Sequence, residues 1–312
     1  MNSIKLVIPV YNDWTSLKKL VQSIDNIVKA DKSDYEIIIV DDGSTLKHEK
    51  ILTFKNIKSI NEIVVLELFS NIGHQRSIAI GLSYINKFKS ADYTVILDGD
   101  GEDRPESIKP LLEQAMKEQK IVFAKRTKRY DSTIFKLFYI SYKFIFRVLT
   151  GRNICGGNFS VIPNILITRL LTVSDLWNHY HASILKSGLP YSTLLTSRGK
   201  RIDGKSKLGF WGLFKHACRS ISVFTENVGL RILLFSLSMS TLSTFCSLLF
   251  IINYTLSQIF VTIIILLNIK VYMFILMIFF QYITVVNRRK HYTSPLLFNY
   301  EDYVSKVYKV SL

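Results

Sequence analysis

The sequence predicts an α/β fold, a mostly parallel sheet with helices on both faces, followed by an interfacial helix and a membrane-spanning helical hairpin. Two observations support this. Short β-branched apolar runs alternate with stretches of helical apolar spacing over residues 4–124, which is typical of a parallel sheet. Residues 232–286 contain one charged residue, Lys270, and this apolar segment is long enough for two spans of roughly 20 residues each.

The elements of the α/β part follow in order. Strands are predicted at residues 4–10, 35–40, 63–68, 91–97 and 121–124, and the first helix at residues 15–29. In residues 71–82 the small side chains of Ser77, Ala79 and Gly81 allow a helix to approach the sheet closely. We therefore expect a catalytic domain at 1–210, an interfacial helix at 211–231, a hairpin at 232–290 and a tail at 291–312.

The most informative stretch is the acidic loop after residues 91–97. Asp98 and Asp100 are two residues apart, with Gly99 between them and Gly101 following, so the backbone can turn and direct both carboxylates to one point. Carboxylates so placed repel each other, and a hard divalent cation such as Mg2+ or Mn2+ relieves that repulsion while leaving positions for phosphate oxygens. An acidic surface turn explains this segment, taken alone, equally well.

Polar side chains also follow the first two predicted strands, at the strand ends where α/β sheets bind ligands. Tyr11 and Asp13 follow the first strand, and Asp41 and Asp42 follow the second. Tyr11 suits stacking on a base, and the aspartates at 41 and 42 suit hydrogen bonds from a base or from ribose hydroxyls. Asp-Asp-Gly-Ser is also a good turn sequence, so a structural role stays open.

The chain is strongly basic, with 40 Lys and Arg against 24 Asp and Glu and a formal net charge of +16. Such an excess suits polyanions, which include nucleic acid, an anionic membrane face and phosphorylated substrates. Because the cations gather near the predicted spans and in one loop, we expect no nucleic-acid partner. Cys155, Cys218 and Cys246 show no paired spacing, which favours a reducing compartment for the head.

The segment 198–207 is the second strong signal, with five cations in ten residues. A flexible cationic loop suits closure over a diphosphate and neutralisation of a leaving group. Beside a membrane, the same run also suits binding of anionic lipid, and the two roles are compatible.

A basic stripe marks the helix predicted at residues 133–149. Lys136, Lys143 and Arg147 share one face of a helix that is otherwise largely apolar and aromatic. This pattern fits the membrane interface, with the cations directed to lipid phosphates. A buried helix whose cations reach out to solvent is the alternative.

The charges around the hairpin predict its topology. Cations precede the first span, expected at 232–253, and follow the second, which ends at Val286, so the head and both termini are expected to be cytoplasmic. A second span that begins near Leu266 keeps Lys270 at the outer edge of the membrane and avoids a charge at mid-bilayer. If Lys270 faces a second subunit in a homo-oligomer, an earlier start is favoured.

Four motifs occur together: Ile8-Pro9-Val10-Tyr11-Asn12, Val40-Asp41-Asp42-Gly43-Ser44, Asn71-x-Gly73 leading to Gly81-Leu82, and Asp98-Gly99-Asp100 with Pro105-Glu106. In this order and spacing they resemble the family 2 glycosyltransferases of the Rossmann-like GT-A fold. The resemblance runs from residue 4 to about residue 210. With two predicted spans behind it, the chain looks most like the dolichyl- or polyprenyl-phosphate glycosyltransferase branch.

The resemblance assigns roles to single residues. Asp98 would lie against the nucleotide sugar and Asp100 would bind the metal, while Glu102 stands where a glutamine often supplies a further metal ligand. The residues that would contact the nucleotide sugar are Pro9, Tyr11, Asp13, Asp41, Asp42, Asp98, Gly99, Arg201 and Lys207.

The resemblance also implies cations that act on the diphosphate. A basic residue follows the strand at 121–124, and Arg126 is the candidate, although Lys125, Lys128 and Arg129 can replace it. Arg201, Gly204, Ser206 and Lys207 match the R-x-x-G-x-S-K element of the family. The expected catalytic set is therefore Asp98, Asp100, Arg126, Arg201 and Lys207.

The function predicted at this point is inverting transfer of a sugar from a UDP- or GDP-sugar to polyprenyl phosphate at the cell (inner) membrane, with Mg2+ or Mn2+ as cofactor, for cell-envelope or glycan assembly. A lipid phosphate is already anionic, so it needs little help from a general base. A glycosyltransferase that acts on a glycan or lipid hydroxyl is the first alternative. A non-catalytic membrane scaffold with a GT-A head is the second.

Overall fold

The structure is a computed structural model that describes residues 2–46, 54, 57–88, 91–126, 133–154, 156–199, 201–203, 209–253, 256–290 and 300–310. The chain forms two compact units. The α/β unit comprises Met1–Ile140, Ile154–Val223 and Thr293–Leu312, and the helical unit comprises Ser141–Asn153 and Phe224–Tyr292. The α/β unit is thus built from chain segments that precede and follow the helical unit.

The α/β unit contains one sheet, with eight strands among the described residues in the order β7-β5-β6-β4-β1-β2-β3-β8. The strands are β1 Ser3–Val10, β2 Asp34–Asp41, β3 Ile60–Leu68, β4 Tyr93–Ile96, β5 Ile121–Arg126, β6 Ser160–Pro163, β7 Tyr191–Thr196 and β8 Val304–Lys309. Strand β1 is parallel to β2 and β4, β2 to β3, and β5 to β7. Strands β6 and β8 are antiparallel to their neighbours. The predicted mostly parallel sheet is confirmed.

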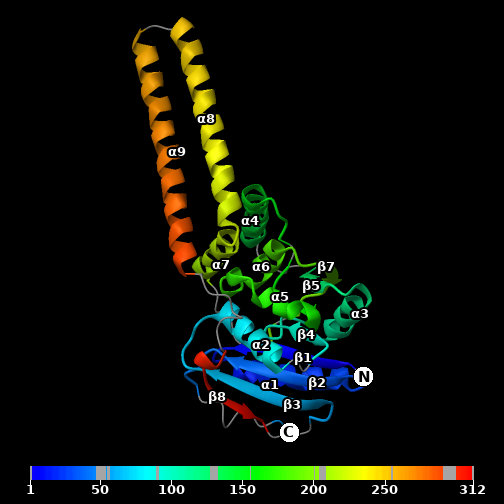
Figure 1. Ribbon diagram of the computed structural model, residues 1–312. Coiled ribbons are helices and arrows are strands. Elements are labelled where there is room, and N and C mark those ends of the chain that lie inside the picture. Colours follow the sequence, from blue (N-terminus) through cyan, green and yellow to red (C-terminus); the bar gives the residue numbers. More distant parts are fainter. Residues whose placement is uncertain are drawn as a thin grey trace. The chain divides into compact units, whose positions relative to one another are not determined.

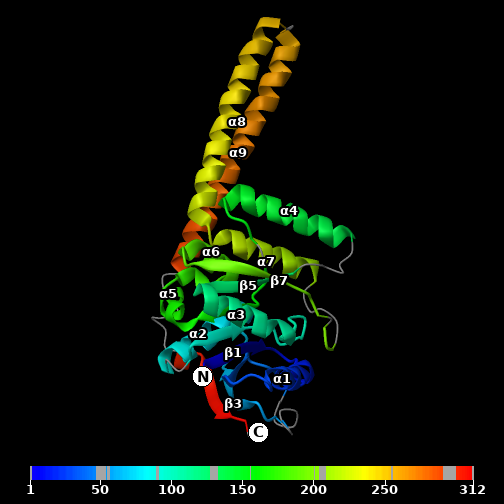
Figure 2. The same cartoon turned by 90° about the vertical axis from the view of Figure 1, so that its right-hand side faces the viewer.

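Helices cover both faces of this sheet (Figure 2). They are α1 Trp14–Val28, α2 His74–Phe88, α3 Ile108–Glu118, α5 Ile167–Leu171 and α6 Tyr180–Ser187. Helix α7, Phe210–Ser222, contacts α6. Successive side chains of a strand point to opposite faces. Accordingly, Leu6 and Ile8 of β1 pack in the core with α1 and α3, whereas Val7 packs in a second core with α2, α5 and α6.

Helix α2 lies very close to the sheet, as its small residues predict. Ser77 and Ala79 are fully buried, and a Cβ atom at Gly81 would lie 2.5 Å from Val7 Cγ1. A side chain at position 81 would therefore push α2 away from β1. This close packing fixes the start of α2 beside the loops that follow the strands.

The C-terminal segment returns to the sheet. Strand β8 pairs with β3, and the Tyr300 ring just before it is buried and packs edge-on against Tyr84 at 5.2 Å. Residues 291–312 are predicted from sequence as a tail, and no pattern in the sequence indicates this strand. Because β8 and β1 belong to one sheet, both ends of the chain lie in the same unit (Figure 1).

We expect Tyr300→Ala to lower the free energy of unfolding by roughly 3 kcal/mol, the scale of deleting a large buried side chain. The exposed Val307 on β8 is the matched control, and Val307→Ala should change stability by no more than about 0.5 kcal/mol. Thermal unfolding of the full chain in detergent measures both. Equal stabilities for the two variants would mean that the C-terminal segment contributes little to the α/β unit.

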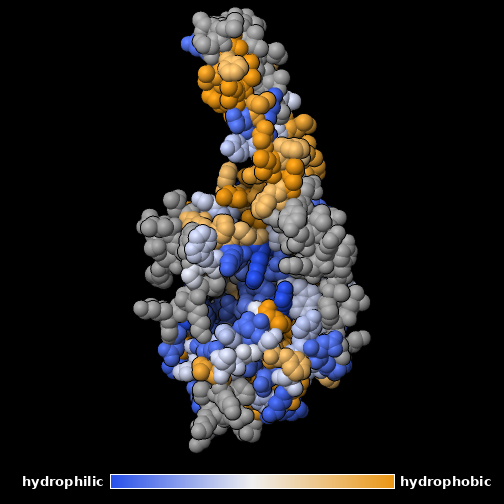
Figure 3. All heavy atoms as spheres, turned by 90° about the vertical axis from the view of Figure 1, so that its left-hand side faces the viewer, coloured by the Kyte–Doolittle hydropathy of each residue, from blue (hydrophilic) through white to orange (hydrophobic). Residues whose placement is uncertain are grey.

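The helical unit is built on two long helices, α8 Thr225–Asn253 and α9 Leu256–Lys290, which run antiparallel and pack side by side (Figure 1). The second half of α4, Thr133–Thr150, belongs to this unit. Arg231 Nη1 donates to the carbonyl oxygen of Val148 at 2.7 Å, and the Phe146 and Phe224 rings pack edge-on at 5.7 Å. The described outer side chains of α8 and α9 form a hydrophobic surface (Figure 3).

Within the described residues, one helical segment, Gln258–Phe280 of α9, is long and apolar enough to cross a membrane, and the broken pair of α7 with the start of α8 gives a second candidate if it counts as one span. The helices differ from the expected boundaries. Helix α7 ends at Ser222 and α8 begins at Thr225, before the expected first span at 232. Helix α9 begins at Leu256 and not near Leu266, which places Lys270 inside the apolar segment.

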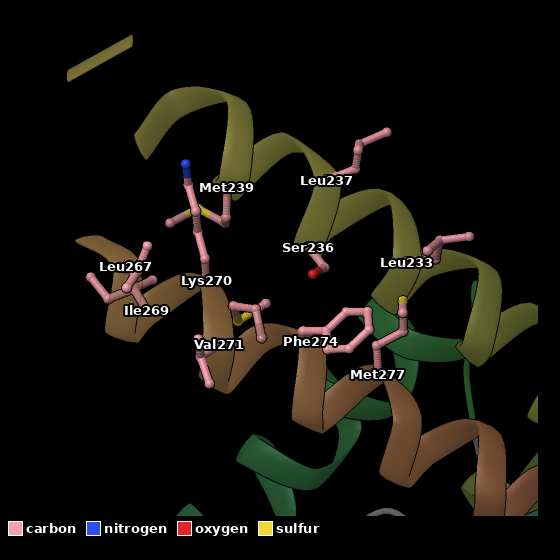
Figure 4. Close-up of a pocket in the computed structure, with 11 residues that line it drawn as sticks. Leu233, Ser236, Leu237, Met239, Leu267, Ile269, Lys270, Val271, Phe274 and Met277 are labelled. Atoms are coloured by element: carbon pink, nitrogen blue, oxygen red, sulfur yellow. The ribbon is translucent and has the colours of Figure 1, made fainter. Parts of the chain in front are cut away.

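Lys270 lies in a groove between the two long helices. The groove has a volume of about 480 Å³, and its lining is apolar apart from Ser236 and Lys270. The lysine side chain points across the groove toward Met239 of α8 (Figure 4). Lys270 is therefore directed to the neighbouring helix.

Candidate active site

Three loops meet where β1, β2 and β4 end. The amide of Asn12 donates to Ser44 Oγ at 2.9 Å, and the amide of Asp42 donates to the Val10 carbonyl oxygen at 2.9 Å, which joins the first two loops. A Cβ atom at Gly99 would lie 3.3 Å from the Pro9 carbonyl oxygen, so the acidic loop lies directly against the first. These strands are parallel and their carboxyl ends share one edge, which explains why the predicted residues converge. The α/β unit is hollowed and hydrophilic on this face (Figure 3).

The two aspartates that end β2 are buried and bonded to backbone amides. Asp41 Oδ1 accepts from the amide of Ser44 at 2.9 Å, and Asp42 Oδ1 accepts from the amides of Ile72 and Gly73 at 2.8 and 3.1 Å. Burial raises the pKa of Asp42 above its ordinary value, and these amides oppose that rise. In this structure Asp42 holds the loop that leads into α2.

We therefore expect Asp42→Ala to act mainly on stability. It leaves two partly buried amides without their acceptor and should lower the free energy of unfolding by about 1–3 kcal/mol. Nucleotide binding, measured by calorimetry below the unfolding temperature, should change less than twofold in its dissociation constant. A large loss of affinity in a stable variant would favour direct contact between Asp42 and the nucleotide.

The acidic loop after β4 is tightly folded. Asp100 Oδ1 accepts from the amide of Glu102 at 3.0 Å, and the buried Asp103 accepts from the amide of Asp98 at 3.1 Å. Gly101 has a φ of +79°, a conformation that glycine adopts readily. Burial raises the pKa of Asp100, and the negative charge of Asp98 raises it further. The loop thus concentrates negative charge in a half-buried place.

The basic segment predicted to close over a diphosphate lies on this acidic loop. Arg201 bridges two carboxylates, with Nη2 2.7 Å from Asp13 Oδ2 and Nη1 3.2 Å from Asp100 Oδ2. Arg198 pairs with Glu102, and the amide of Ile202 donates to the Asp100 carbonyl oxygen at 3.0 Å.

Glycines make this docking possible. A Cβ atom at Gly199 would lie 2.7 Å from the Gly101 carbonyl oxygen, and a Cβ atom at Gly101 would collide with the Ile202 side chain. The two loops therefore fit only while both positions carry no side chain.

Several predicted residues take less part in this arrangement. Tyr11 is 40% exposed at the end of β1, and Pro9 lies within β1. Arg126 ends β5, where its backbone pairs with Thr196 of β7, and its side chain is outside the description. Lys207 lies outside the described residues, together with Gly204 and Ser206.

A polar network that the sequence analysis did not find extends from Asp98. His74 Nε2 lies 3.0 Å from Asp98 Oδ1 and 3.0 Å from Asn158 Nδ2. Gln75 donates to Asn158 Oδ1 at 3.3 Å and accepts from the amide of Tyr180 at 2.6 Å, which connects α2 to α6. Desolvation lowers the pKa of His74, but the charge of Asp98, its hydrogen bond and the charges of Asp42 and Asp100 together outweigh it, so the pKa lies above the ordinary value. The partners are far apart in sequence, so spacing could not reveal them.

Comparison with known proteins identifies the arrangement. Residues 5–171 match the family described as glycosyl transferase family 2. The chain belongs to this family. Asp98, Asp100 and Glu102 lie inside the matched region, and Arg201 lies beyond it.

Two relatives illustrate the range of this family. The chain is 24% identical to the Bacillus subtilis protein named uncharacterized glycosyltransferase YkcC, over 71% of this chain and 68% of the relative. It is 33% identical to the undecaprenyl-phosphate 4-deoxy-4-formamido-L-arabinose transferase of Erwinia tasmaniensis, over 44% of this chain and 41% of that relative. The match thus spans less than half of the arabinose transferase.

A solved structure confirms the fold of this family 2 glycosyltransferase. Glucosyl-3-phosphoglycerate synthase from Mycobacterium tuberculosis, crystallised with Mn2+, UDP and phosphoglyceric acid, superposes with a TM-score of 0.52 at 13% identity. The superposition covers 73% of this chain and 79% of that one. The GT-A fold expected from the sequence motifs is therefore confirmed.

Proposed function

We propose that this glycosyltransferase moves a sugar from a nucleotide sugar to the phosphate of a polyprenyl lipid at a membrane. The observation that supports a nucleotide-sugar donor is the pair of ion pairs that Arg201 makes with Asp13 and Asp100, beside the carboxyl ends of the strands. Half-buried carboxylates and a guanidinium at one place suit a metal-bound diphosphate, because carboxylates bind the metal and a guanidinium binds the phosphate oxygens.

The residues present fit a divalent cation. Within the described part of the chain no three His, Cys, Asp or Glu side chains form a metal-holding group. A cation held by one or two carboxylates and the substrate phosphates needs no such group. Burial, and after it the negative charge of Asp98, raise the pKa of Asp100, and a cation would relieve the repulsion between these two carboxylates. Asp100, with Asp98 beside it, would hold Mg2+ or Mn2+, and the solved Mycobacterium structure contains Mn2+ with UDP.

The chain's own residues then account for the transfer. An oxygen of the acceptor phosphate forms the new bond to the anomeric carbon, the bond from that carbon to the diphosphate breaks, and its electron pair leaves with the nucleoside diphosphate. Attack opposite the leaving group inverts the anomeric centre. Arg201 is placed to stabilise the charge that grows on the diphosphate, with Arg126 and Lys207 as proposed partners. When bound, the divalent cation supplies further positive charge there.

The lipid acceptor is supported by the relatives and by the hairpin. Several relatives are named undecaprenyl-phosphate transferases, and the apolar Gln258–Phe280 segment suits a bilayer. Strands β3 and β8, which precede and follow the helical unit, pair in one sheet. A chain that leaves this sheet and returns to it must cross a membrane an even number of times. This supports two spans, α8 and α9, with both termini on one side of the membrane. We assign that side to the cytoplasm because cations precede the first span and follow the second.

A hydroxyl acceptor is the second candidate, favoured by the contact between His74 and Asp98. A histidine paired with a carboxylate suits removal of a proton from a hydroxyl. A phosphate acceptor needs no such base, so the two acceptors can be told apart by experiment.

The test uses purified full-length protein with UDP- and GDP-sugars, Mn2+ or Mg2+, and either undecaprenyl phosphate or undecaprenol. Mass spectrometry should find a sugar on the phosphate lipid only, and only when the cation is present. Transfer to undecaprenol or to a glycan, with none to the phosphate, would establish the hydroxyl acceptor instead. Nucleotide binding without any transfer would favour the scaffold.

Topology is tested without truncation, because removal of everything after Arg231 would also remove β8. A cysteine introduced as Gln258→Cys at the start of α9 should react with a membrane-impermeant maleimide on intact cells. The matched Val307→Cys on β8 should be protected until the membrane is opened. Reaction of Val307→Cys on intact cells would place the α/β unit outside the cell and overturn the cytoplasmic orientation.

A further inference from the structure

Side-chain hydrogen bonds connect helix α7 to the loop before α6. His216 Nε2 lies 3.2 Å from His179 Nε2, and Asn178 donates to the Arg219 carbonyl oxygen at 3.2 Å and to Ser222 Oγ at 2.7 Å. Tyr180, the first residue of α6, is held by Gln75 of the network that reaches Asp98. A continuous series of polar contacts therefore ties α7 to the acidic loop within the α/β unit.

The hydrogen bonds define which nitrogen of His216 carries its proton. His179 Nδ1 accepts from the amide of Ala182 at 3.2 Å, so the proton of neutral His179 is on Nε2. That proton is donated to His216 Nε2, which leaves the proton of His216 on Nδ1. His216 thus presents one N–H donor next to the cation of Arg219.

His216 is neutral at physiological pH. Its pKa is lowered to about 4, mainly by desolvation and also by the charge of His74, while the charge of Asp98 opposes the shift. His216 is nevertheless exposed to solvent. The influence of both His74 and Asp98 indicates that His216 lies on the same side of the unit as the acidic loop.

The two flanks of α7 differ in chemistry. With roughly 100° between successive residues, His216 and Arg219 lie on one flank, Phe214 lies on the other, and Trp211 and Lys215 lie between them. Trp211 and Phe214 are 71% and 44% exposed. Exposed aromatic side chains beside cations are typical of a helix at a lipid surface. A lipid phosphate bound alongside α7 would place its hydrocarbon chain against Trp211 and Phe214. Its phosphate would lie on the flank of His216 and Arg219, which is nearest Asp98.

We propose that His216 and Arg219 bind the phosphate of the lipid acceptor, while Trp211 and Phe214 contact the start of its hydrocarbon chain. This inference rests on the proposed function and names the acceptor half of the site. A guanidinium binds two phosphate oxygens at once, and the Nδ1–H of His216 can donate to a further oxygen. The acceptor would thus be held by groups separate from Arg201, which serves the donor.

The experiment titrates geranyl phosphate into full-length protein in phosphatidylcholine nanodiscs that are loaded with UDP or GDP and Mn2+. Arg219→Ala and His216→Ala should each raise the dissociation constant of geranyl phosphate about tenfold or more, the loss expected for a charge-assisted hydrogen bond. Nucleotide affinity should be unchanged. Arg169→Ala, which removes an exposed arginine of α5, is the matched control and should bind as the wild type does.

Conservative variants guard against misfolding. Arg219→Lys and His216→Gln keep a donor and should retain most of the affinity, and thermal unfolding should match the wild type. Geraniol, which lacks the phosphate, should bind weakly to every variant. Equal binding of geraniol and geranyl phosphate would overturn the assignment of a phosphate site.

The outcomes separate the two proposals. If the wild type binds geranyl phosphate and both alanine variants bind it equally well, the site on α7 is wrong while the phosphate acceptor stands. If the wild type binds nucleotide but no geranyl phosphate, the proposed acceptor class is wrong and this inference is wrong with it. If phosphatidylglycerol nanodiscs abolish the difference between wild type and Arg219→Ala, Arg219 serves general lipid binding and the proposal is overturned.

Discussion

Asp100→Asn is expected to reduce sugar transfer by about 10³-fold or more, on the scale of losing a group that stabilises charge in the transition state. The substitution replaces a carboxylate with a neutral amide at the position that would hold the cation. It also removes one of the two carboxylates that Arg201 bridges. Mn2+ should no longer strengthen nucleotide binding, which calorimetry with and without the cation measures.

Glu102→Gln is the informative control for that experiment. Glu102 lies two residues further along the same loop and pairs with Arg198, so it has a partner of its own. We expect it to lower transfer much less than Asp100→Asn does, about tenfold at most, the scale of one surface ion pair. Equal, complete losses in both variants would support Glu102 as a metal ligand, and full activity in Asp100→Asn would remove the metal site from this loop.

Arg201→Ala is expected to lower transfer by about 10²–10³-fold while it weakens nucleotide-sugar binding far less. Negative charge on the diphosphate grows as the sugar leaves, so a cation there stabilises the transition state more than the bound substrate. Rates at saturating donor, together with the donor dissociation constant, separate the two effects. Equal losses in rate and in affinity would mean that Arg201 serves only to bind the donor.

The same variant tests the bridge from Arg201 to the two carboxylates. Arg201 lies 2.7 Å from Asp13 and 3.2 Å from Asp100, so it competes with a cation for those carboxylates. Mn2+ alone should therefore bind Arg201→Ala more tightly than the wild type. Arg104→Ala is the matched control, since Arg104 is an exposed arginine of the same loop that bonds Ser197, and it should leave both activity and Mn2+ binding unchanged.

The apolar periodicity of the sequence was sufficient to predict most of the elements of the α/β unit. Strand β1 and helices α1 and α4 appear within a few residues of the expected bounds, because apolar periodicity reports which side of an element is buried. The convergence of Asp13, Asp98 and Asp100 also followed from sequence, since loops after parallel strands share one edge of the sheet. The start of α9 at Leu256 did not follow, because an apolar run marks no internal boundary.

The sequence by itself determined the fold class, the acidic loop with Asp98 and Asp100, and the basic segment with Arg201, because each is a contiguous pattern whose chemistry does not depend on distant residues. Only the tertiary structure decided what these segments contact. The bridge from Arg201 to Asp13, the pairing of β8 with β3, and the contacts from His216 toward Asp98 join residues far apart in the chain. Such contacts form when packing of the sheet brings distant segments together, and no local spacing encodes them.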